Sequence, residues 1–550
     1  MRSSLLVPFA ASTLLLMACG GSSGSDSTGT GAGGQAHGSS SSTAGSGGEG
    51  GSGGSAPTSV TVTTQSGEVK GTGLGSTREF LGIPYAAPPT GALRWKPPQA
   101  AAVWTSPRDA TQRGPACPQL MQLGSAFDTT TSEDCLTLNV WTPKNAIGAP
   151  VLFWIHGGGF TSGTGGDPTF DGQAFSETTG AVIVTINYRL GPLGFLSLAG
   201  LASEDQAHPT SGLYGFEDQR FAMQWVKANI AAFGGDPTNV TIFGESAGGV
   251  STCLHLVSPQ SQGLFARAIV ESGACHSSGQ TETDARPQGE SLATTLGCTD
   301  AATELACLRG KTPAEITTAL PLRAGEIAGP GANWFPVVDG ANIPDQPYKL
   351  LDAGQVAKVP TIFGTNKDEG TIFFALGLSA KDDTEYLSVM DQLFPGHGQA
   401  ILAKYPSSAF PSTQDAATAA VGDGVFACSA RRTVRAMTKA GAPSYLYQFV
   451  HVPTTGLFQD LGAFHSVELP FVFQSSYLNI TLDDDELKLA KTIEGYWFGL
   501  AKSGDPNFTG APNWPVYDAT KDQNQVLDLT ISTGSKLKSD LCDFWDGLGF

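Results

Sequence analysis

The pattern of apolar and polar positions from about residue 58 onward predicts alternating strands and helices. Residues 59–72, "SVTVTTQSGEVKGT", alternate with period two and place Gly67 at the turn of a hairpin. The runs at 150–155, "PVLFWI", and 181–190, "AVIVTINYRL", are nearly continuously apolar, which is typical of strands buried on both faces. Strands of that kind need helices on each side of the sheet.

Apolar residues recur at helical spacing in residues 218–237, "DQRFAMQWVKANIAAFGGDP". The sequence Gly-Gly-Asp-Pro at the end of this segment predicts the end of the helix. Residues 239–257 then read as strand, tight turn and helix, and 265–273 and 359–370 as further short strands before polar turns. This alternation predicts an α/β fold with a large, mostly parallel central sheet and right-handed crossovers.

The first 57 residues have a different composition. Residues 1–18 carry one positive charge, Arg2, then an apolar stretch and small residues, as a secretory signal peptide does. The ending "LMAC" resembles a bacterial lipobox, in which cleavage precedes a cysteine that becomes lipidated, here Cys19. Residues 20–57 contain 26 Gly or Ser in 38 positions and predict a flexible linker.

We therefore expect a signal peptide at 1–18, a linker at 19–57 and one catalytic domain at 58–550. The chain would be exported, either as a lipoprotein of the bacterial cell envelope anchored through Cys19 or as a secreted protein that loses this cysteine with its signal. No later segment is long and apolar enough for a membrane span.

Charge and cysteine usage exclude two classes of partner. The net charge of −19 leaves no basic surface for nucleic acid. Eight cysteines follow Cys19, but none forms a C-x-x-C pair, so we expect no structural zinc site. Disulfides suit an exported chain, although spacing alone cannot assign their connectivity.

The sequence Gly244-Glu245-Ser246-Ala247-Gly248 matches the G-x-S-x-G pattern between a predicted strand and a predicted helix. A sharp turn at this place holds the serine in strained geometry with its hydroxyl above the sheet, and small neighbours relieve the crowding. The N-terminus of the following helix favours developing negative charge. Ser246 is therefore a candidate nucleophile.

A serine nucleophile also needs an oxyanion site, a base and an acid. The segment "HGGGF", residues 156–160, follows a predicted buried strand. Hydrolases with a G-x-S-x-G elbow keep their oxyanion loop at this place, and the glycines let successive N–H groups turn toward one point.

The base should be a histidine late in the chain. His451 reads as a strand interior and His397 as a surface turn, whereas His465 lies in a loop before an apolar stretch. Asp368 and Glu369 both follow a strand end, and their chemistry alone does not choose between these two acids.

Seven segments make the chain similar to the type-B carboxylesterases, a family with the α/β-hydrolase fold that includes carboxylesterases, cholinesterases and some fungal lipases. They are "FLGIPYAAPPTGALRWKPPQ", "EDCLTLNVWTP", "HGGGF", "INYRLGPLGFL", "GLYGFEDQRFAMQWVKANIAAFGGDPTNVTIFGESAGG", "NKDEG" and "FHSVELPFVF". The resemblance covers the chain from about residue 60 to its end.

The resemblance implies a role for each candidate. Ser246 would be the nucleophile, His465 the base and Glu369 the acid, while the N–H groups of Gly158, Gly159 and Ala247 would form the oxyanion hole. It also implies a glutamate near the active site at Glu245, and disulfides Cys117–Cys135, Cys298–Cys307 and Cys428–Cys542. Cys253 and Cys275 remain, either as a fourth disulfide or as two buried thiols.

The resemblance further implies hydrolysis of small carboxylic esters through an acyl-enzyme, without a metal or organic cofactor. A lipase acting on long-chain glycerides and a non-catalytic adhesion module are the alternatives. The loop between Cys117 and Cys135 lacks the tryptophan that binds quaternary ammonium in cholinesterases and has only Phe127 as an aromatic, which argues against a choline ester. Four aromatic residues are candidates for the acyl pocket or for the core: Trp334, Phe335, Phe373 and Phe374.

Overall fold

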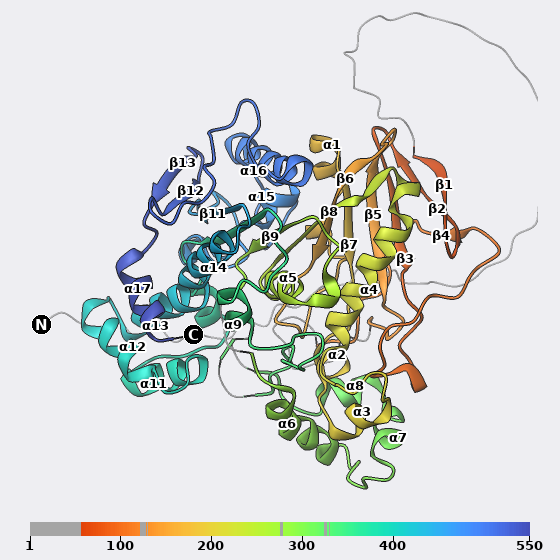
Figure 1. Ribbon diagram of the computed structural model, residues 1–550, viewed down its shortest axis with the longest axis horizontal. Helices are drawn as coiled ribbons and strands as arrows, with labels where there is room; N and C mark the ends of the chain where they lie inside the picture. Colours follow the sequence, from red (N-terminus) through yellow and green to blue (C-terminus); the bar gives the residue numbers. More distant parts are fainter. Residues whose placement is uncertain are drawn as a thin grey trace, which may run out of the picture. The chain divides into compact units, whose positions relative to one another are not determined.

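A computed structural model describes residues 57–120, 128, 130–275, 279–323, 327–328 and 331–549 (Figure 1). The predicted signal peptide, most of the linker and Phe127 lie outside these residues. One sheet of thirteen strands organises the described part of the chain. The strands are β1 Thr58–Thr64, β2 Gly67–Leu74, β3 Thr77–Pro84, β4 Arg108–Asp109, β5 Thr137–Pro143, β6 Ala149–Ile155, β7 Val182–Ile186, β8 Gly235–Glu245, β9 Arg267–Glu271, β10 Thr361–Asn366, β11 Ser444–Phe449, β12 Gln523–Leu527 and β13 Ser532–Ser535.

The sheet is parallel at its centre and antiparallel at its edges. The strand order is β1-β2-β3-β5-β7-β6-β8-β9-β10-β11-β12-β13, with β4 beside β2, and every pair from β7 to β12 is parallel. Strands β1 and β2 form the expected hairpin, in which Gly67 has φ 137°. The predicted α/β fold with a mostly parallel sheet is confirmed.

The continuous apolar run of β6 has a direct structural cause. Val151, Phe153 and Ile155 pack into one hydrophobic cluster with helices α4 and α5, whereas Leu152 and Trp154 pack into a second cluster with α1 and α16. Because successive side chains of a strand point to opposite faces, both faces of the sheet are covered.

Seventeen α-helices occur in the described residues. They are α1 Gln173–Thr179, α2 Gly191–Phe195, α3 Ala199–Glu204, α4 Tyr214–Asn229, α5 Ala247–Val257, α6 Glu282–Thr295, α7 Glu304–Arg309, α8 Pro313–Thr318, α9 Pro347–Asp352, α10 Thr371–Ala375, α11 Asp383–Leu393, α12 Gly398–Lys404, α13 Thr413–Val421, α14 Cys428–Lys439, α15 Leu469–Phe473, α16 Asp484–Ser503 and α17 Ser539–Gly547. Helix α4 begins four residues before the predicted segment, and a 3-10 turn at Ile230–Phe233 completes that segment.

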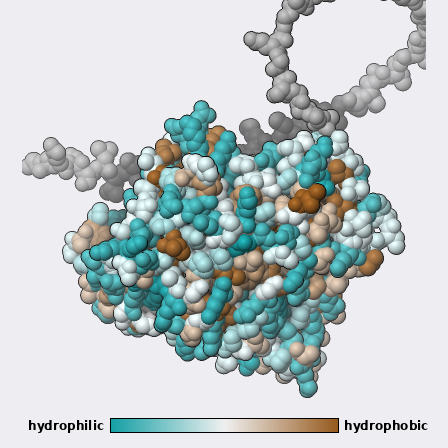
Figure 2. All heavy atoms as spheres, turned by 45° about the horizontal axis from the view of Figure 1, so that its top comes forward, coloured by the Kyte–Doolittle hydropathy of each residue, from teal (hydrophilic) through white to brown (hydrophobic). Residues whose placement is uncertain are grey.

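Four disulfides crosslink the described residues. Three join the pairs that the resemblance implies, Cys117–Cys135, Cys298–Cys307 and Cys428–Cys542. The fourth joins Cys253 to Cys275, so these two residues are not free thiols. None of the helices in the described part could span a membrane. On the face drawn in Figure 2, apolar residues are scattered among polar ones.

Candidate active site

Ser246 lies at the tight turn between β8 and α5, with φ 57° and ψ −122°. The flanking glycines are required because other backbone approaches them closely. A Cβ atom at Gly248 would lie 1.9 Å from the carbonyl oxygen of Ile155 in β6, and one at Gly244 would lie 2.6 Å from the same oxygen. The strained serine is held by its own N–H, which donates to the carbonyl of Glu271 in β9 over 3.0 Å. This geometry is typical of a nucleophile elbow.

The glycine loop after β6 lies against this serine. A Cβ atom at Gly157 would lie 3.1 Å from the Cβ atom of Ser246. Gly158 and Gly159 have φ 101° and 58°, which side chains rarely allow. Among the described residues, their N–H groups donate to no backbone carbonyl, and neither does that of Ala247. These N–H groups are thus available to a ligand at the serine.

His156, the first residue of the glycine loop, packs against the ring of Tyr188 and contacts the loop backbone. Its ring stacks on Tyr188 at 4.4 Å, and Nδ1 lies 2.8 Å from the carbonyl oxygen of Gly157. Burial lowers the pKa of His156 to about 4, so this histidine is neutral at physiological pH.

His465 lies in the loop between β11 and α15, and two contacts with the end of β10 fix that loop. The Asp368 carboxylate accepts from the N–H of Ala463 over 2.9 Å, and Asn366 Nδ2 donates to the carbonyl of Phe464 over 2.9 Å. The imidazole is buried, and its Nδ1 donates to Glu369 Oε2 over 2.6 Å. Its Nε2 has no hydrogen-bond partner among the described residues and lies 3.1 Å from Oε1 of Glu245, the residue before the serine.

Glu369 is held in place through its second oxygen. Oε1 accepts from Ser272 Oγ over 2.6 Å, from Thr365 Oγ1 over 2.8 Å and from the N–H of Asn366 over 2.6 Å. The carboxylate is buried and its acceptor capacity is used, so its position toward His465 is well defined. Asp368 instead accepts from the N–H of Ala463, so the two adjacent acids have different partners.

The remaining candidate histidines lie elsewhere. His451 is two residues past the end of β11, so its prediction as a strand-interior residue is wrong. Its ring nitrogens lie 3.0 Å and 3.1 Å from Asp528 and Glu486. His397 precedes α12 at that helix's N-terminus.

Carboxylates dominate the electrostatics around His465. Burial lowers the pKa of the imidazole, but the nearby charges of Glu245 and Glu369 raise it by more, so the net shift is upward. Glu245 is itself fixed by Ser466 Oγ, which donates to its Oε1 over 2.6 Å. Burial raises the pKa of Glu271 to about 8, and burial together with neighbouring carboxylates raises that of Glu468 well above the ordinary range. Glu271 and Glu468 are therefore protonated at neutral pH.

Two aromatic rings flank the imidazole. The rings of Phe373 and Phe426 lie 5.1 Å and 4.9 Å from that of His465, and they stack on each other. Phe426 comes from a π-helical segment, Gly422–Ala427, and such segments recur at functional sites. Of the other candidate aromatics, Trp334 and Phe374 are core residues, whereas Phe335 contacts Phe160 of the glycine loop at 5.1 Å.

Sequence reasoning did not find Ser272, Thr365, Phe426 or Glu468. Ser272 and Thr365 lie at the carboxyl ends of β9 and β10, the sheet edge where sites of open α/β proteins occur. That position is the signal that identifies them. No comparable local pattern marks Phe426.

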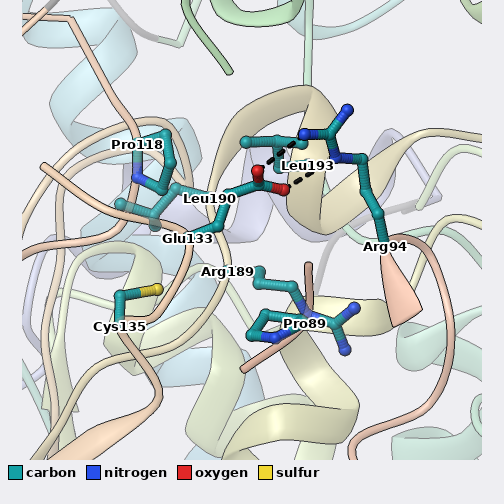
Figure 3. Close-up of a pocket in the computed structure, with 8 residues that line it drawn as sticks. All are labelled: Pro89, Arg94, Pro118, Glu133, Cys135, Arg189, Leu190 and Leu193. Carbon is teal, nitrogen blue, oxygen red and sulfur yellow. Dashed lines mark hydrogen bonds and ion pairs between the residues drawn. The ribbon is translucent and has the colours of Figure 1, made fainter. Parts of the chain in front are cut away.

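The small cavity in Figure 3 is not a substrate site. It has a volume of about 10 Å³, too small for an ester, and it lies beside the Arg94–Glu133 ion pair. Arg94 also donates to the carbonyls of Leu308 and Lys311. This ion pair therefore ties the loop of the first disulfide to the segment after α7.

Comparisons with known proteins show which proteins this chain resembles. The sequence model that defines the carboxylesterase family matches residues 58–545 of this chain. The chain is 36% identical to a cholinesterase of Mus musculus over 88% of this chain and 86% of that protein. It is 35% identical to the para-nitrobenzyl esterase of Bacillus subtilis over 86% and 95% of the two chains. A solved structure of a PNB esterase superposes with a TM-score of 0.78 at 34% identity, covering 88% of this chain and 99% of that one.

Proposed function

This chain belongs to the carboxylesterase family and is a serine hydrolase of carboxylic esters, and we propose that Ser246, His465 and Glu369 carry the reaction. The observation that carries this assignment is the convergence of four distant segments. The strained serine, Glu369 and the glycine loop directly follow β8, β10 and β6, and His465 comes from the loop between β11 and α15.

In the first half-reaction the Ser246 hydroxyl attacks the ester carbonyl. His465 Nε2 accepts the hydroxyl proton. Glu369 accepts a hydrogen bond from Nδ1, which keeps the hydrogen of the neutral imidazole on Nδ1 and leaves Nε2 free to act as the base. The negative charge of Glu369 stabilises the imidazolium that forms. The phenyl rings of Phe373 and Phe426 shield this ion pair from water, which strengthens it.

The carbonyl oxygen becomes negative as the serine adds. The N–H groups of Gly158, Gly159 and Ala247 bind this oxyanion, aided by the N-terminus of α5. His465 then protonates the leaving alcohol, which leaves an acyl-serine. A water molecule attacks this ester in the same way, with His465 again taking and returning the proton.

Single substitutions of the three residues test this assignment. We expect Ser246→Ala to lower kcat for p-nitrophenyl esters by about 10⁴-fold or more with an unchanged melting temperature, and His465→Gln and Glu369→Gln to lower kcat by large factors. His397→Gln is the matched control, because His397 lies at the N-terminus of α12 and not in the loop of His465. Retained activity in Ser246→Ala, or an equal loss in His397→Gln, would contradict the mechanism.

We also propose that the protein is exported and tethered to a membrane by lipidated Cys19. The apolar segment before "LMAC" and the Gly/Ser-rich linker support this proposal. The four disulfides of the catalytic domain support export, because such bonds persist in oxidising compartments. Expressed in a bacterial host, the full chain should incorporate labelled palmitate and partition into detergent, and Cys19→Ala should do neither. Equal partitioning of both forms would contradict the anchor.

A further inference from the structure

A cavity of about 250 Å³ lies beside the catalytic centre. Val250 lines it one helical turn from Ser246, since its N–H donates to the Ser246 carbonyl over 2.8 Å. Val425, next to Phe426, and Phe335, in contact with the glycine loop, line it from two other segments. The volume exceeds the roughly 150 Å³ that accommodates a benzene ring in an apolar protein cavity.

Most of the cavity wall is apolar. The disulfide between Cys253 and Cys275 forms part of it and joins α5 to the segment after β9. Large apolar side chains form much of the remainder: Leu254, Ile327, Phe335, Leu393, Phe394 and Trp545. A surface of this kind binds hydrocarbon or aromatic groups.

The charged side chains among the described residues of the cavity wall are all positive. Its described lining residues include two arginines and neither aspartate nor glutamate, although the whole chain has a net charge of −19. Arg432 is paired, because its Nε donates to Asp546 over 2.7 Å. Within the part of the chain that the structure describes, Arg323 has no acidic partner, and its guanidinium donates only to the carbonyl of Ile327 over 3.2 Å.

The guanidinium of Arg323 is incompletely satisfied. Its Nε is shielded from solvent and has no hydrogen-bond partner in the described part of the chain. Burial lowers the pKa of Arg323, which is the direction expected for a cation without a counter-ion. Asn333, also in the lining, has a buried Oδ1 without a partner, and rotation of its amide would present an N–H₂ group at the same place. Both side chains can therefore donate to an anion.

We propose that this cavity binds an apolar portion of the substrate that ends in a carboxylate, with Arg323 as its counter-ion. The proposal rests on the ester hydrolysis assigned above and narrows its substrate to an anionic ester. The apolar walls bind the hydrocarbon, and the half-buried arginine pairs with the anionic end through charge-assisted hydrogen bonds.

Matched substrates test the charge on either side of the ester bond. For the acyl side, mono-p-nitrophenyl adipate is compared with p-nitrophenyl methyl adipate, which differs only in its capped carboxylate. For the alcohol side, the hexanoate ester of 6-hydroxyhexanoic acid is compared with that of 6-hydroxyhexanamide. The wild type should favour the anionic member of one pair in kcat/KM, and the pair that shows the preference locates the charge.

Variants connect the preference to Arg323. Arg323→Gln should lower kcat/KM for the favoured anionic ester by roughly 10- to 100-fold while changing that for its neutral partner less than about twofold. Arg323→Lys should retain much of the preference. The control Arg286→Gln removes an arginine that pairs with Glu282 outside the cavity, and it should change neither substrate.

Three outcomes would overturn the proposal: no preference for either anionic ester in the wild type, an equal loss on anionic and neutral esters in Arg323→Gln, or a preference that is unchanged in Arg323→Gln. Glu326 follows closely in sequence and lies outside the described residues, so Glu326→Gln is measured as well. A preference lost in that variant as fully as in Arg323→Gln would also overturn it. If the neutral esters are cleaved by the wild type and not by Ser246→Ala, the assigned mechanism stands in every case.

Discussion

Removing the charge of Glu245 should make the enzyme active at lower pH. In the structure Glu245 Oε1 lies 3.1 Å from Nε2 of His465, and both side chains are buried. The carboxylate therefore stabilises the protonated imidazole, which is inactive as a base. Glu245→Gln keeps the size of the side chain and an oxygen acceptor for Ser466 while removing the charge.

The magnitude follows from the distance. Two unit charges 3.1 Å apart interact by about 1 kcal/mol at the dielectric constant of water and about 5 kcal/mol at an effective constant of 20. Because one pKa unit corresponds to 1.36 kcal/mol, the pKa of His465 should fall by roughly 1 to 4 units. Glu369 stays in place and continues to raise this pKa.

The assay is the pH dependence of kcat/KM for a neutral p-nitrophenyl ester, because this parameter reports ionisations of the free enzyme. In the wild type the acidic limb should lie above the ordinary histidine pKa of about 6.5. In Glu245→Gln it should move to lower pH by at least about one unit. Glu486→Gln is the control, since Glu486 is also buried and lies 3.1 Å from a histidine nitrogen, that of His451, which is not in the site. An unchanged limb in Glu245→Gln, or one that moves to higher pH, would refute this reasoning.

Two further predictions concern stability. Gly248→Ala should destabilise the fold by about 3 kcal/mol or more, because the new methyl group would lie 1.9 Å from the Ile155 carbonyl, whereas Gly547→Ala meets no neighbour within 4 Å and should leave the melting temperature unchanged. Replacing both cysteines of Cys428–Cys542 by alanine should lower the free energy of unfolding by about 5 kcal/mol, and the same change in Cys298–Cys307 by about 3 kcal/mol, because the bridges close loops of 114 and 9 residues. Urea titrations measure both, and equal losses for the two bridges would contradict the loop-entropy explanation.

Local sequence patterns were sufficient to predict whether most segments form a strand or a helix. The apolar run of β6 and the alternation in β1 and β2 each follow from which faces of a strand are buried, a property that repeats along the chain itself. The elbow around Ser246 and the glycine loop at 156–160 could also be located, because each is a contiguous set of residues with unusual backbone demands. The antiparallel edges and the order of the strands were not predictable, since pairing joins segments that are far apart in sequence.

Which of the two adjacent acids faces His465 depends on the fold. Asp368 and Glu369 are adjacent and chemically alike, yet one accepts from the Ala463 N–H and the other from His465. The family resemblance named Glu369, but only the path of β10 and the loop after β11 explains why its side chain, and not that of Asp368, faces the imidazole.

Neighbouring residues along the chain were therefore enough to predict the class of fold, the tight turn at Ser246 and the kind of chemistry. Tertiary structure alone decided the bond between Cys253 and Cys275, the position of Phe426 against His465 and the unpaired Arg323 in an apolar cavity. Each of these depends on contacts between elements that are distant along the chain, and such contacts leave no periodic or contiguous pattern.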